Sequence, residues 1–576
     1  MKTTISSIIN STGNARYRLL DILHKLQSEY KFISEDIIDE LSTDMDISPS
    51  QIKQVISFYH YLYDKNMGEY TIHINRSVVA LISGYAEVVK TLEEECNCKL
   101  ESLSESAKFG LWNTSCIGMS DQEPAILING LPFTDLTPEK TKNIISDLKE
   151  GVELKQLFNK YETDKYKLLI GQSSVNKTKT YIRGPLLDND YSNFSAVELL
   201  NTRNSPSDIL GIISDSGLQG RGGAGFPAGR KWKAAAKVKS EKKYVICNAD
   251  EGEPGTFKDR VLLTEKPEKI FEGMLICAYA IGAHKGILYL RKEYEYMKPY
   301  LENVLQQMRD KGILGRDNSY NFEMRIQIGA GAYVCGEASA LLESMEGKRG
   351  EPREKYMQPT EFGYLGKPTI VNNVETFAIV PSIIKNGAEW YKAYGTKFSA
   401  GTKVLSIAGD CAKPGIYELP WGITVDTILK LSYAKNSKAV IVGGMSGKLI
   451  PPEEFDRKIC YSDLATGGAF MILNNNRNLL KDVVLPALDF FIDESCGSCS
   501  TCRNVPGYLR EIARYMEHKK LSEKDLLRIE EWSKLLSISR CGLGKSVSSL
   551  LIGFIRKFTD DYEIEDSIED NFLSVN

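Results

Sequence analysis

The sequence predicts a chain of several domains, α/β in its middle and helical toward both ends. Its 576 residues are too many for one domain, and the length alone suggests three to five. In the middle, two glycine-dense turns lie beside short β-prone runs, a pattern typical of α/β ligand sites. Residues 1–70 and 480–565 are predicted to be helical.

The composition excludes several classes of partner. The net charge is −4 with both signs interspersed, which does not suit nucleic acid or an anionic membrane. No apolar run approaches about 18 residues and no secretory core is present, so we expect a cytoplasmic protein without a membrane span. Four of the twelve cysteines have metal-ligand spacing. Five others look like small core residues: Cys247, Cys277, Cys335, Cys411 and Cys460.

The chain begins with a predicted helical module at residues 1–70. Ser34 begins one helix, and Ser48 caps another in which Gln51 reaches back to the cap. From about residue 69 to residue 150 the pattern changes to short strands and helices. The segments are a strand at 70–74, a helix at 84–96, a strand at 125–130 and a helix at 136–148.

The first glycine-dense stretch is GLQGRGGAGFPAGRKW, residues 217–232. Glycine costs about 0.5–1 kcal/mol in a helix or strand, so this density indicates a backbone that turns its N–H groups toward a flat or anionic ligand. A β-prone run at 244–247 then ends in a polar group: Asn248, Asp250, Glu251 and Glu253. The alternative is a glycine-rich surface loop beside an edge strand.

A second stretch, residues 325–353, repeats this design. It has a strand at 325–328, a glycine turn, and a helix from about Glu337 whose N-terminal amides face an anion. Residues 366–377 then add Asn372 and Asn373. The repetition favours a ligand site over a surface loop.

Together these three blocks resemble the flavoprotein (NADH-binding, 51-kDa-type) subunit of complex I and its relatives in soluble hydrogenases and formate dehydrogenases. The resemblance covers about residue 191 to the C-terminus and implies FMN in an α/β domain at residues 206–385. Backbone of Gly220, Arg221, Gly222, Gly223 and Ala224 would wrap the ring. The matching lining residues are Lys231, Asn248, Asp250, Tyr333, Gly336, Asn372, Asn373 and Thr376. FAD in a Rossmann fold is the weaker alternative, because no GxGxxG with a following acidic residue is present.

The resemblance also implies a nicotinamide nucleotide stacked on the flavin, with hydride passing directly between them and no catalytic side chain. Phe226 matches the family's stacking aromatic residue, and its polar contacts are matched by Glu251, Glu253, Glu337 and Lys355. Three positions depart from the family pattern: Ala338 replaces a second carboxylate, and Ala234 and Gln358 replace aromatic residues.

These departures allow two interpretations. The site is degraded and binds no nucleotide, or it is retuned for NADP(H). In the family the lost carboxylate lies near the adenine ribose, where it would repel a 2′-phosphate. Its removal, with Arg230 and Lys233 nearby and Gln358 able to donate, would admit a dianion. We favour NADP(H), because Phe226 and the other polar contacts persist.

Residues 71–150 resemble the thioredoxin-like [2Fe-2S] subunit that partners the flavoprotein in complex I. That family has four cysteines, whereas here Cys116 remains, Ser120 replaces its partner, and the early pair is missing. One thiolate cannot hold a two-iron cluster, so we predict a docking scaffold without a cluster. The alternative is a cluster rebuilt from Cys96, Cys98 and Cys116 with a non-cysteine ligand.

The rest of the chain is predicted as a linker and lead-in at 151–205, a ubiquitin-like (SLBB) domain at 400–455, implied by the resemblance, and a helical bundle at 480–565. The bundle carries Cys496, Cys499 and Cys502, with Cys541 downstream. Three cysteines at C-x2 spacing plus one distant cysteine predict a [4Fe-4S] cluster rather than zinc. Gly497, Gly542 and Gly544 would let backbone N–H groups approach it.

The predicted function is that of a diaphorase-type electron-input/output subunit of a multi-subunit oxidoreductase. It would exchange hydride between NAD(P)(H) and FMN, and electrons through one [4Fe-4S] cluster with iron–sulfur subunits of a hydrogenase or formate dehydrogenase. A [2Fe-2S] thioredoxin-like subunit is a further expected partner, and the sequence does not distinguish simple transfer from electron bifurcation. The rivals are an assembly subunit that keeps the cluster but binds no nucleotide, and a flavoprotein that takes electrons from ferredoxin.

Overall fold

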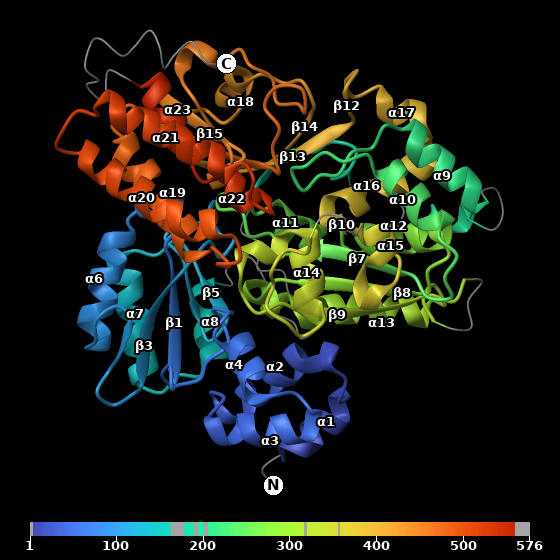
Figure 1. Cartoon of the computed structure of the whole chain (residues 1–576), viewed down its shortest axis with the longest axis horizontal. Helices are drawn as coiled ribbons and strands as arrows, with labels where there is room; N and C mark the ends of the chain where they lie inside the picture. Colours follow the sequence, from blue (N-terminus) through green and yellow to red (C-terminus); the bar gives the residue numbers. More distant parts are fainter. Residues whose placement is uncertain are drawn as a thin grey trace.

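The computed structural model describes residues 4–162, 178–188, 194–200, 205–315, 320–354 and 358–558. Figure 1 shows the parts of the chain around a central α/β domain, with the N-terminal helices beneath it and the C-terminal helices beside it. Within the described residues, no helix is long and apolar enough to span a membrane. Of the predicted site residues, only Lys355 lies outside the described residues.

The N-terminal module is helical, as predicted, and packs beneath the central domain (Figure 1). Ser34 Oγ accepts the N–H of Ile37, and Ser48 Oγ accepts the N–H of Gln51. Gln51 does not reach back to its cap, because its side-chain oxygen accepts a hydrogen bond from Arg16 at 3.1 Å. The elements are α1 (Ile5–Thr12), η1 (Arg16–Arg18), α2 (Leu19–Tyr30), α3 (Glu35–Met45) and α4 (Pro49–Ile56).

The thioredoxin-like domain is a five-stranded sheet in the order β2-β3-β1-β4-β5. Strands β1 and β3 are parallel, so the helix α6 between them runs in the opposite direction. Cys96 and Cys98 therefore lie toward one end of the sheet and Cys116 beyond the other. The structure does not bring together the three cysteines of the alternative cluster. The elements are β1 (Tyr70–Asn75), α5 (Val78–Ile82), α6 (Tyr85–Cys96), β2 (Ser102–Leu103), β3 (Phe109–Thr114), β4 (Ile126–Ile128), β5 (Leu131–Phe133), α7 (Pro138–Lys149) and α8 (Leu154–Glu162).

The segment predicted as a linker is built into its neighbours. Helix α8 packs on the thioredoxin-like sheet, and β6 (Thr180–Ile182) pairs with β14 of a later domain. The buried carboxylate of Glu418 accepts the backbone N–H groups of Gly184, Leu186 and Leu187. The turn η2 (Val197–Leu199) is tied in the same way to buried Glu272. Residues 178–188 and 194–200 therefore join two domains rather than separate them.

The central domain contains a four-stranded parallel sheet in the order β10-β7-β8-β9. Ligands of such sheets bind at the carboxyl ends of the strands. The predicted strands at 244–247 and 325–328 are confirmed as parts of β7 and β9. The elements are α9 (Pro206–Asp215), α10 (Ala228–Lys237), β7 (Tyr244–Ala249), α11 (Lys258–Glu265), α12 (Pro267–Ile281), β8 (Lys285–Leu290), η3 (Lys292–Met297), α13 (Lys298–Asp310), β9 (Glu323–Ile328), η4 (Tyr333–Gly336), α14 (Ala338–Met345), α15 (Pro359–Phe362), η5 (Tyr364–Gly366), β10 (Thr369–Asn373), α16 (Val374–Asn386) and α17 (Ala388–Lys392).

The next domain has a six-stranded sheet in the order β16-β15-β17-β13-β14-β6. It runs past the predicted boundary at residue 455, because β17 pairs with both β13 and β15 in the middle of the sheet. The elements are β11 (Gly395–Thr396), β12 (Ser399–Ala400), β13 (Thr402–Gly409), β14 (Gly415–Pro420), α18 (Val425–Leu431), β15 (Ser437–Val442), η6 (Gly444–Ser446), β16 (Lys448–Ile450), η7 (Pro452–Glu454) and β17 (Ala469–Asn474).

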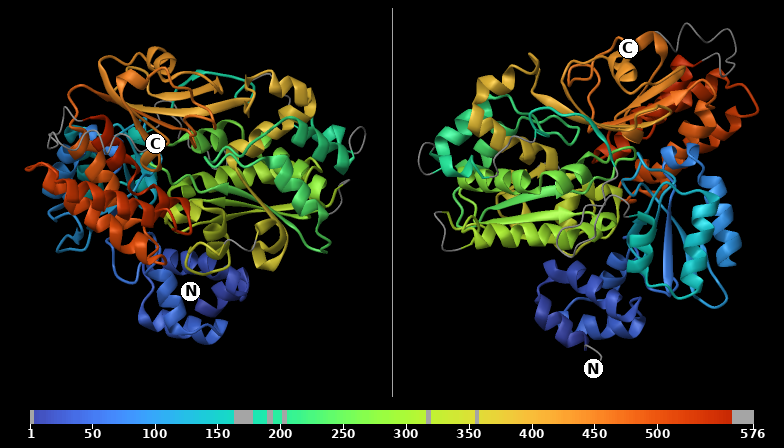
Figure 2. Two further views of the ribbon diagram at one scale, coloured as in Figure 1. Left: turned by 45° about the horizontal axis from the view of Figure 1, so that its top comes forward. Right: turned by 180° about the vertical axis from the view of Figure 1, so that it is seen from behind.

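The C-terminal helices lie against the thioredoxin-like domain in both views of Figure 2. An ion pair between Arg76 and Asp489, 3.2 Å apart, joins the two parts. The elements are η8 (Leu480–Val484), α19 (Leu485–Asp493), α20 (Ser500–Met516), α21 (Glu523–Leu536), α22 (Gly542–Ser546) and α23 (Ser549–Lys557).

Candidate functional site

Three asparagines meet at the carboxyl edge of the parallel sheet. Asn373 pairs in register with Asn248, and Asn372 pairs with Cys247. The amide of Asn248 donates to the carbonyl of Gly336 at 2.8 Å, which holds the turn η4 at the same edge. The two predicted stretches and the asparagine pair thus converge on one place, where α/β sheets bind ligands.

The glycine-rich loop between α9 and α10 lies over the start of α16. The N–H of Arg221 donates to Thr376 Oγ1 at 2.9 Å. Gly223 and Gly225 have φ values of 113° and 66°, which favour glycine. The Arg221 side chain is buried and donates to Ala400 O and Tyr391 Oη, away from the sheet edge. Arg221 would therefore serve a ligand through its backbone only, as predicted.

Two buried polar atoms at this edge have no hydrogen-bond partner within the described residues: Asn372 Nδ2 and Asp250 Oδ2. Lys231 Nζ lies beside Asn372 and donates to Val371 O at 2.9 Å and Asn372 Oδ1 at 3.2 Å. Burial lowers the pKa of Lys231 to about 8. Buried polar atoms without partners are rare in proteins. A flavin ring offers carbonyl acceptors and an N–H donor, so the donor set fits FMN.

The four predicted cysteine ligands line one cavity with Val334, Pro352 and Arg540. Cys499 precedes α20, Cys502 lies in its first turn, and Cys541 precedes α22. A side chain at Gly544 would meet Ser539 at 2.5 Å and Cys502 at 3.2 Å, so only glycine fits there. Within the described part of the chain, no three His, Cys, Asp or Glu side chains could share a single metal ion. The cavity therefore suits a multi-atom cluster better than zinc.

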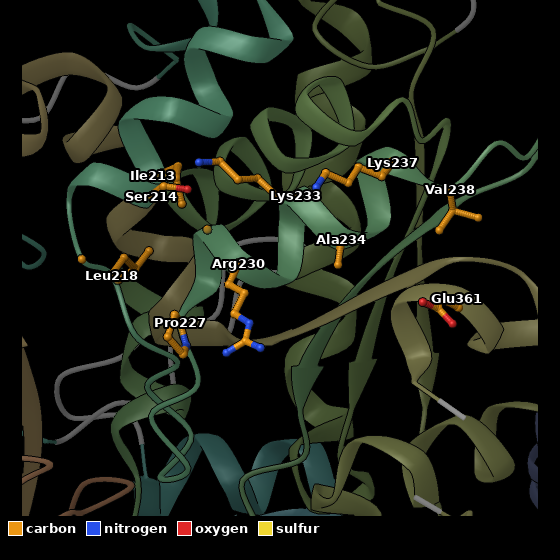
Figure 3. Close-up of a pocket in the computed structure, with 12 residues that line it drawn as sticks. Ile213, Ser214, Leu218, Pro227, Arg230, Lys233, Ala234, Lys237, Val238 and Glu361 are labelled. Carbon is orange, nitrogen blue, oxygen red and sulfur yellow. The ribbon is translucent and has the colours of Figure 1, made fainter. Parts of the chain in front are cut away.

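A further cavity of about 640 Å³ opens on the outer face of α10. Arg230, Lys233 and Lys237 line it from that helix, and Glu361 lines it from α15 (Figure 3). Ala234 is part of its wall, at a position where the family has an aromatic residue. The Arg230 guanidinium lies 5.8 Å from the ring of Phe226, which is 46% exposed, as suits a stacking residue.

Three protein families match successive segments of the chain. The thioredoxin-like [2Fe-2S] ferredoxin family matches residues 5–149, the Nuo51 FMN-binding domain matches 213–382, and the NADH-ubiquinone oxidoreductase-F iron-sulfur binding region matches 482–565. The NAD-reducing hydrogenase HoxS subunit alpha of Cupriavidus necator is 44% identical over 569 residues, 98% of this chain and 94% of that protein. The chain belongs to the family of NAD-reducing hydrogenase alpha subunits.

Two other comparisons agree with this family. A crystal structure of an NAD⁺-reducing [NiFe]-hydrogenase in the H₂-reduced state superposes with a TM-score of 0.88 at 34% identity, covering 96% of this chain and 94% of that chain. The NADP-reducing hydrogenase subunit HndC of Solidesulfovibrio fructosivorans is 39% identical over 373 residues, 62% of this chain and 76% of that protein.

As a member of this family the chain is an oxidoreductase subunit with an FMN-binding domain and a [4Fe-4S] region. When bound, FMN would supply the hydride and one-electron chemistry. Hydride transfer needs no side chain as acid or base, so the contribution of the chain would be alignment. Asn248, Asn372 and Lys231 would orient the ring and its tail at the sheet edge, within the glycine loop.

The three carboxylates predicted to contact the nucleotide are engaged within the protein. Glu251 accepts the N–H groups of Asp259 and Arg260 at 3.0 and 3.2 Å and the hydroxyl of Tyr294 at 3.0 Å. Glu253 accepts Ser446 N–H at 3.1 Å, and Glu337 caps α14. Both oxygens of Glu251 accept hydrogen bonds from the start of α11, so this carboxylate supports that helix, and its contact with a nucleotide stays a prediction.

A buried charge network next to Asn373 was not predicted from the sequence. Lys258 pairs with Asp259 at 2.5 Å and with Glu375 at 3.2 Å, and Glu375 also pairs with Lys403. Asn373 donates to Asp259 at 2.6 Å and accepts from Lys258 at 3.2 Å. The only local signal was the charged run 258–260 between apolar segments. The network holds Asn373 in place from below.

We expect Asp250→Asn to change how stability depends on pH. Burial raises the pKa of the Asp250 carboxyl from 3.8 to about 8, with Glu293 and Glu494 adding to it and Arg291 opposing it. The stability that the neutral acid contributes is fully present below about pH 4 and is lost as the pH rises through 8. In the flavin-free chain, Asp250→Asn should therefore gain about 5 kcal/mol over the wild type between these limits, at about 1.4 kcal/mol for each pH unit. Thermal unfolding at pH 5 and pH 8.5, with exposed Asp36→Asn as control, measures this gain; parallel pH curves would contradict it.

Proposed function

We propose that the chain is the diaphorase-type subunit of a hydrogenase complex, exchanging hydride between NADP(H) and FMN and single electrons with an iron–sulfur partner subunit. The observation that supports this proposal is the arrangement of two sites. One is formed by Asn248, Asn372 and the glycine loop at the sheet edge, and the other by four cysteines in one cavity nearby. The relatives named as hydrogenase subunits support the choice of complex over a formate dehydrogenase.

The preference for NADP(H) rests on charge. Ala338 begins α14 without the family's second carboxylate, and three cations against one anion line the cavity on α10. The exposed Gln358 precedes α15, which packs against α10 and supplies Glu361 to the cavity wall. A 2′-phosphate is a dianion that charge-assisted hydrogen bonds would hold there. Relatives include both NAD- and NADP-reducing proteins, so membership alone does not decide the nucleotide.

Calorimetric titration of the FMN-loaded chain with NADPH and NADH tests this preference. We expect NADPH to bind about tenfold or more tightly, since a hydrogen bond to a charged group contributes about 1.5–3 kcal/mol. Ala338→Glu and Arg230→Gln should each weaken NADPH and leave NADH within about twofold. Lys239→Gln, exposed on the same side but outside the cavity, is the matched control. Tighter NADH than NADPH in the wild type would overturn the choice of nucleotide.

The assembly-subunit rival and the ferredoxin rival make different predictions. A scaffold that binds no nucleotide would purify without flavin absorbance. A flavoprotein fed by ferredoxin would keep the flavin, but no nucleotide would bleach it under anaerobic conditions. Purification of the native complex, with its subunits identified, would also show whether a [2Fe-2S] thioredoxin-like subunit is present.

A further inference from the structure

One short turn, η4, contacts both cofactor sites. The carbonyl of its last residue, Gly336, accepts a hydrogen bond from the side-chain amide of Asn248 at the sheet edge. Its second residue, Val334, lines the cavity of the four cysteines. The gap between flavin and cluster is therefore set by four residues, and their placement decides how far an electron must travel.

The carboxylate of Glu494 fixes this turn. Glu494 follows α19, two residues before Cys496, and its side chain is 4% exposed. Glu494 Oε2 accepts the N–H of Tyr333, the first residue of η4, at 2.9 Å. The Tyr333 ring packs edge-on against Phe490 of α19 with centroids 4.9 Å apart. The cluster loop thus holds the flavin-side turn directly.

The thioredoxin-like domain holds Glu494 in turn. The hydroxyl of Ser115 donates to Glu494 Oε1, so both carboxylate oxygens have partners. Ser115 begins the loop that keeps Cys116, the last matching cluster cysteine. Arg260 donates to Gly118 O in this loop at 2.9 Å, and Arg291 donates to Cys116 O. Both arginines are buried and come from the central domain, so the loop is part of its wall.

The N-terminal module also forms hydrogen bonds with this region. The N–H groups of His60 and Tyr61 donate to Gly331 O and Ala330 O, both at 3.0 Å. These carbonyls belong to the glycine turn just before η4. Two parts of the chain that carry no flavin contact thus converge on the turn between the cofactors.

We propose that Glu494, held by Ser115, is a positioning residue that fixes η4 and so sets the flavin-to-cluster gap. The loop of the thioredoxin-like domain that contains Ser115 and Cys116 would then support the turn between the two cofactor sites. The inference rests on the proposed function: two electrons arrive with hydride from the nucleotide and leave one at a time to the cluster. No further oxidant or reductant is needed.

The test uses Glu494→Gln and Ser115→Ala in the cofactor-loaded chain. Glutamine keeps the shape but is neutral and has a single acceptor oxygen, so the charge-assisted hydrogen bond from the Tyr333 N–H becomes a weaker neutral one. We expect faster hydrogen–deuterium exchange at the Tyr333 amide and cluster reduction about tenfold slower, as small misplacements of reacting groups cost 10–100-fold. The rate at which nucleotide bleaches the flavin should stay within twofold of the wild type. Exposed Glu511→Gln and half-buried Ser102→Ala are matched controls in the same two domains.

The outcomes separate this inference from the proposed function. The paramagnetic signal of the cluster measures cluster reduction. If its rate is unchanged in both variants, the positioning role is overturned, whatever the exchange data show. An equal slowing of flavin bleaching and cluster reduction would also overturn it, since that indicates general damage. If no nucleotide bleaches the wild-type flavin, the proposed function fails, and amide exchange at Tyr333 in the two variants still tests whether Glu494 and Ser115 hold η4.

Discussion

Cys541→Ala will remove the iron–sulfur cluster and disconnect the flavin from downstream acceptors. The four cysteines line one cavity, and Cys541 reaches it from the start of α22, far along the chain from the other three. A [4Fe-4S] cluster needs four ligands, and alanine supplies none. Even partners outside the ligand set cost 10–100-fold when mutated, so we expect a loss of at least about 100-fold in electron delivery.

Iron content and electron delivery to a one-electron acceptor measure this effect. Flavin content and the bleaching of flavin by nucleotide should remain, because the sheet edge with Asn248 and Asn372 is built from other elements. Cys411→Ala, a half-buried cysteine outside the cavity, is the control and should keep full iron. Full iron in Cys541→Ala would show that the ligand set is wrong.

Local chemistry in the sequence predicted the elements that build the site. The caps at Ser34 and Ser48, the strand that leads into Asn248, and the C-x2 cysteines all depend on neighbours within a few residues. Such signals are short-range, and they are visible without a fold. The glycine loop was predictable for the same reason, because its backbone requires glycine locally.

Contacts between distant residues were not predictable in this way. Strand β6 has three residues and gains its place only from β14 and the carboxylate of Glu418. Nor did the sequence indicate that Glu251 supports the first turn of α11 and accepts a hydrogen bond from Tyr294. In each case the deciding partner lies in another element, and no periodicity in the sequence indicates it.

Lys403→Met will destabilise the chain by about 3–5 kcal/mol and release FMN, because it leaves the buried Glu375 carboxylate with one of its two lysine partners. Lys403 is 1% exposed, pairs with Glu375 and donates to the Arg221 carbonyl at 3.2 Å. Burial alone would raise the pKa of the Glu375 carboxyl, but Lys403, Lys258 and Arg221 hold it below its usual value. Without Lys403, Glu375 stays charged with less compensation, and the glycine loop loses the donor under Arg221.

The double variant Lys403→Met/Glu375→Leu distinguishes a lost partner from lost packing. Replacing both members of a buried pair by apolar groups is often neutral, so the double variant should recover part of the stability that the single variant loses. Recovery of flavin should be smaller, since Arg221 O still lacks its donor. Urea unfolding and FMN release report the two effects, with exposed Lys435→Met as a control expected within about 0.5 kcal/mol of the wild type. A single variant that keeps both stability and flavin would show that the network does not hold the loop, and the Arg221 backbone would then owe its position to Thr376 alone.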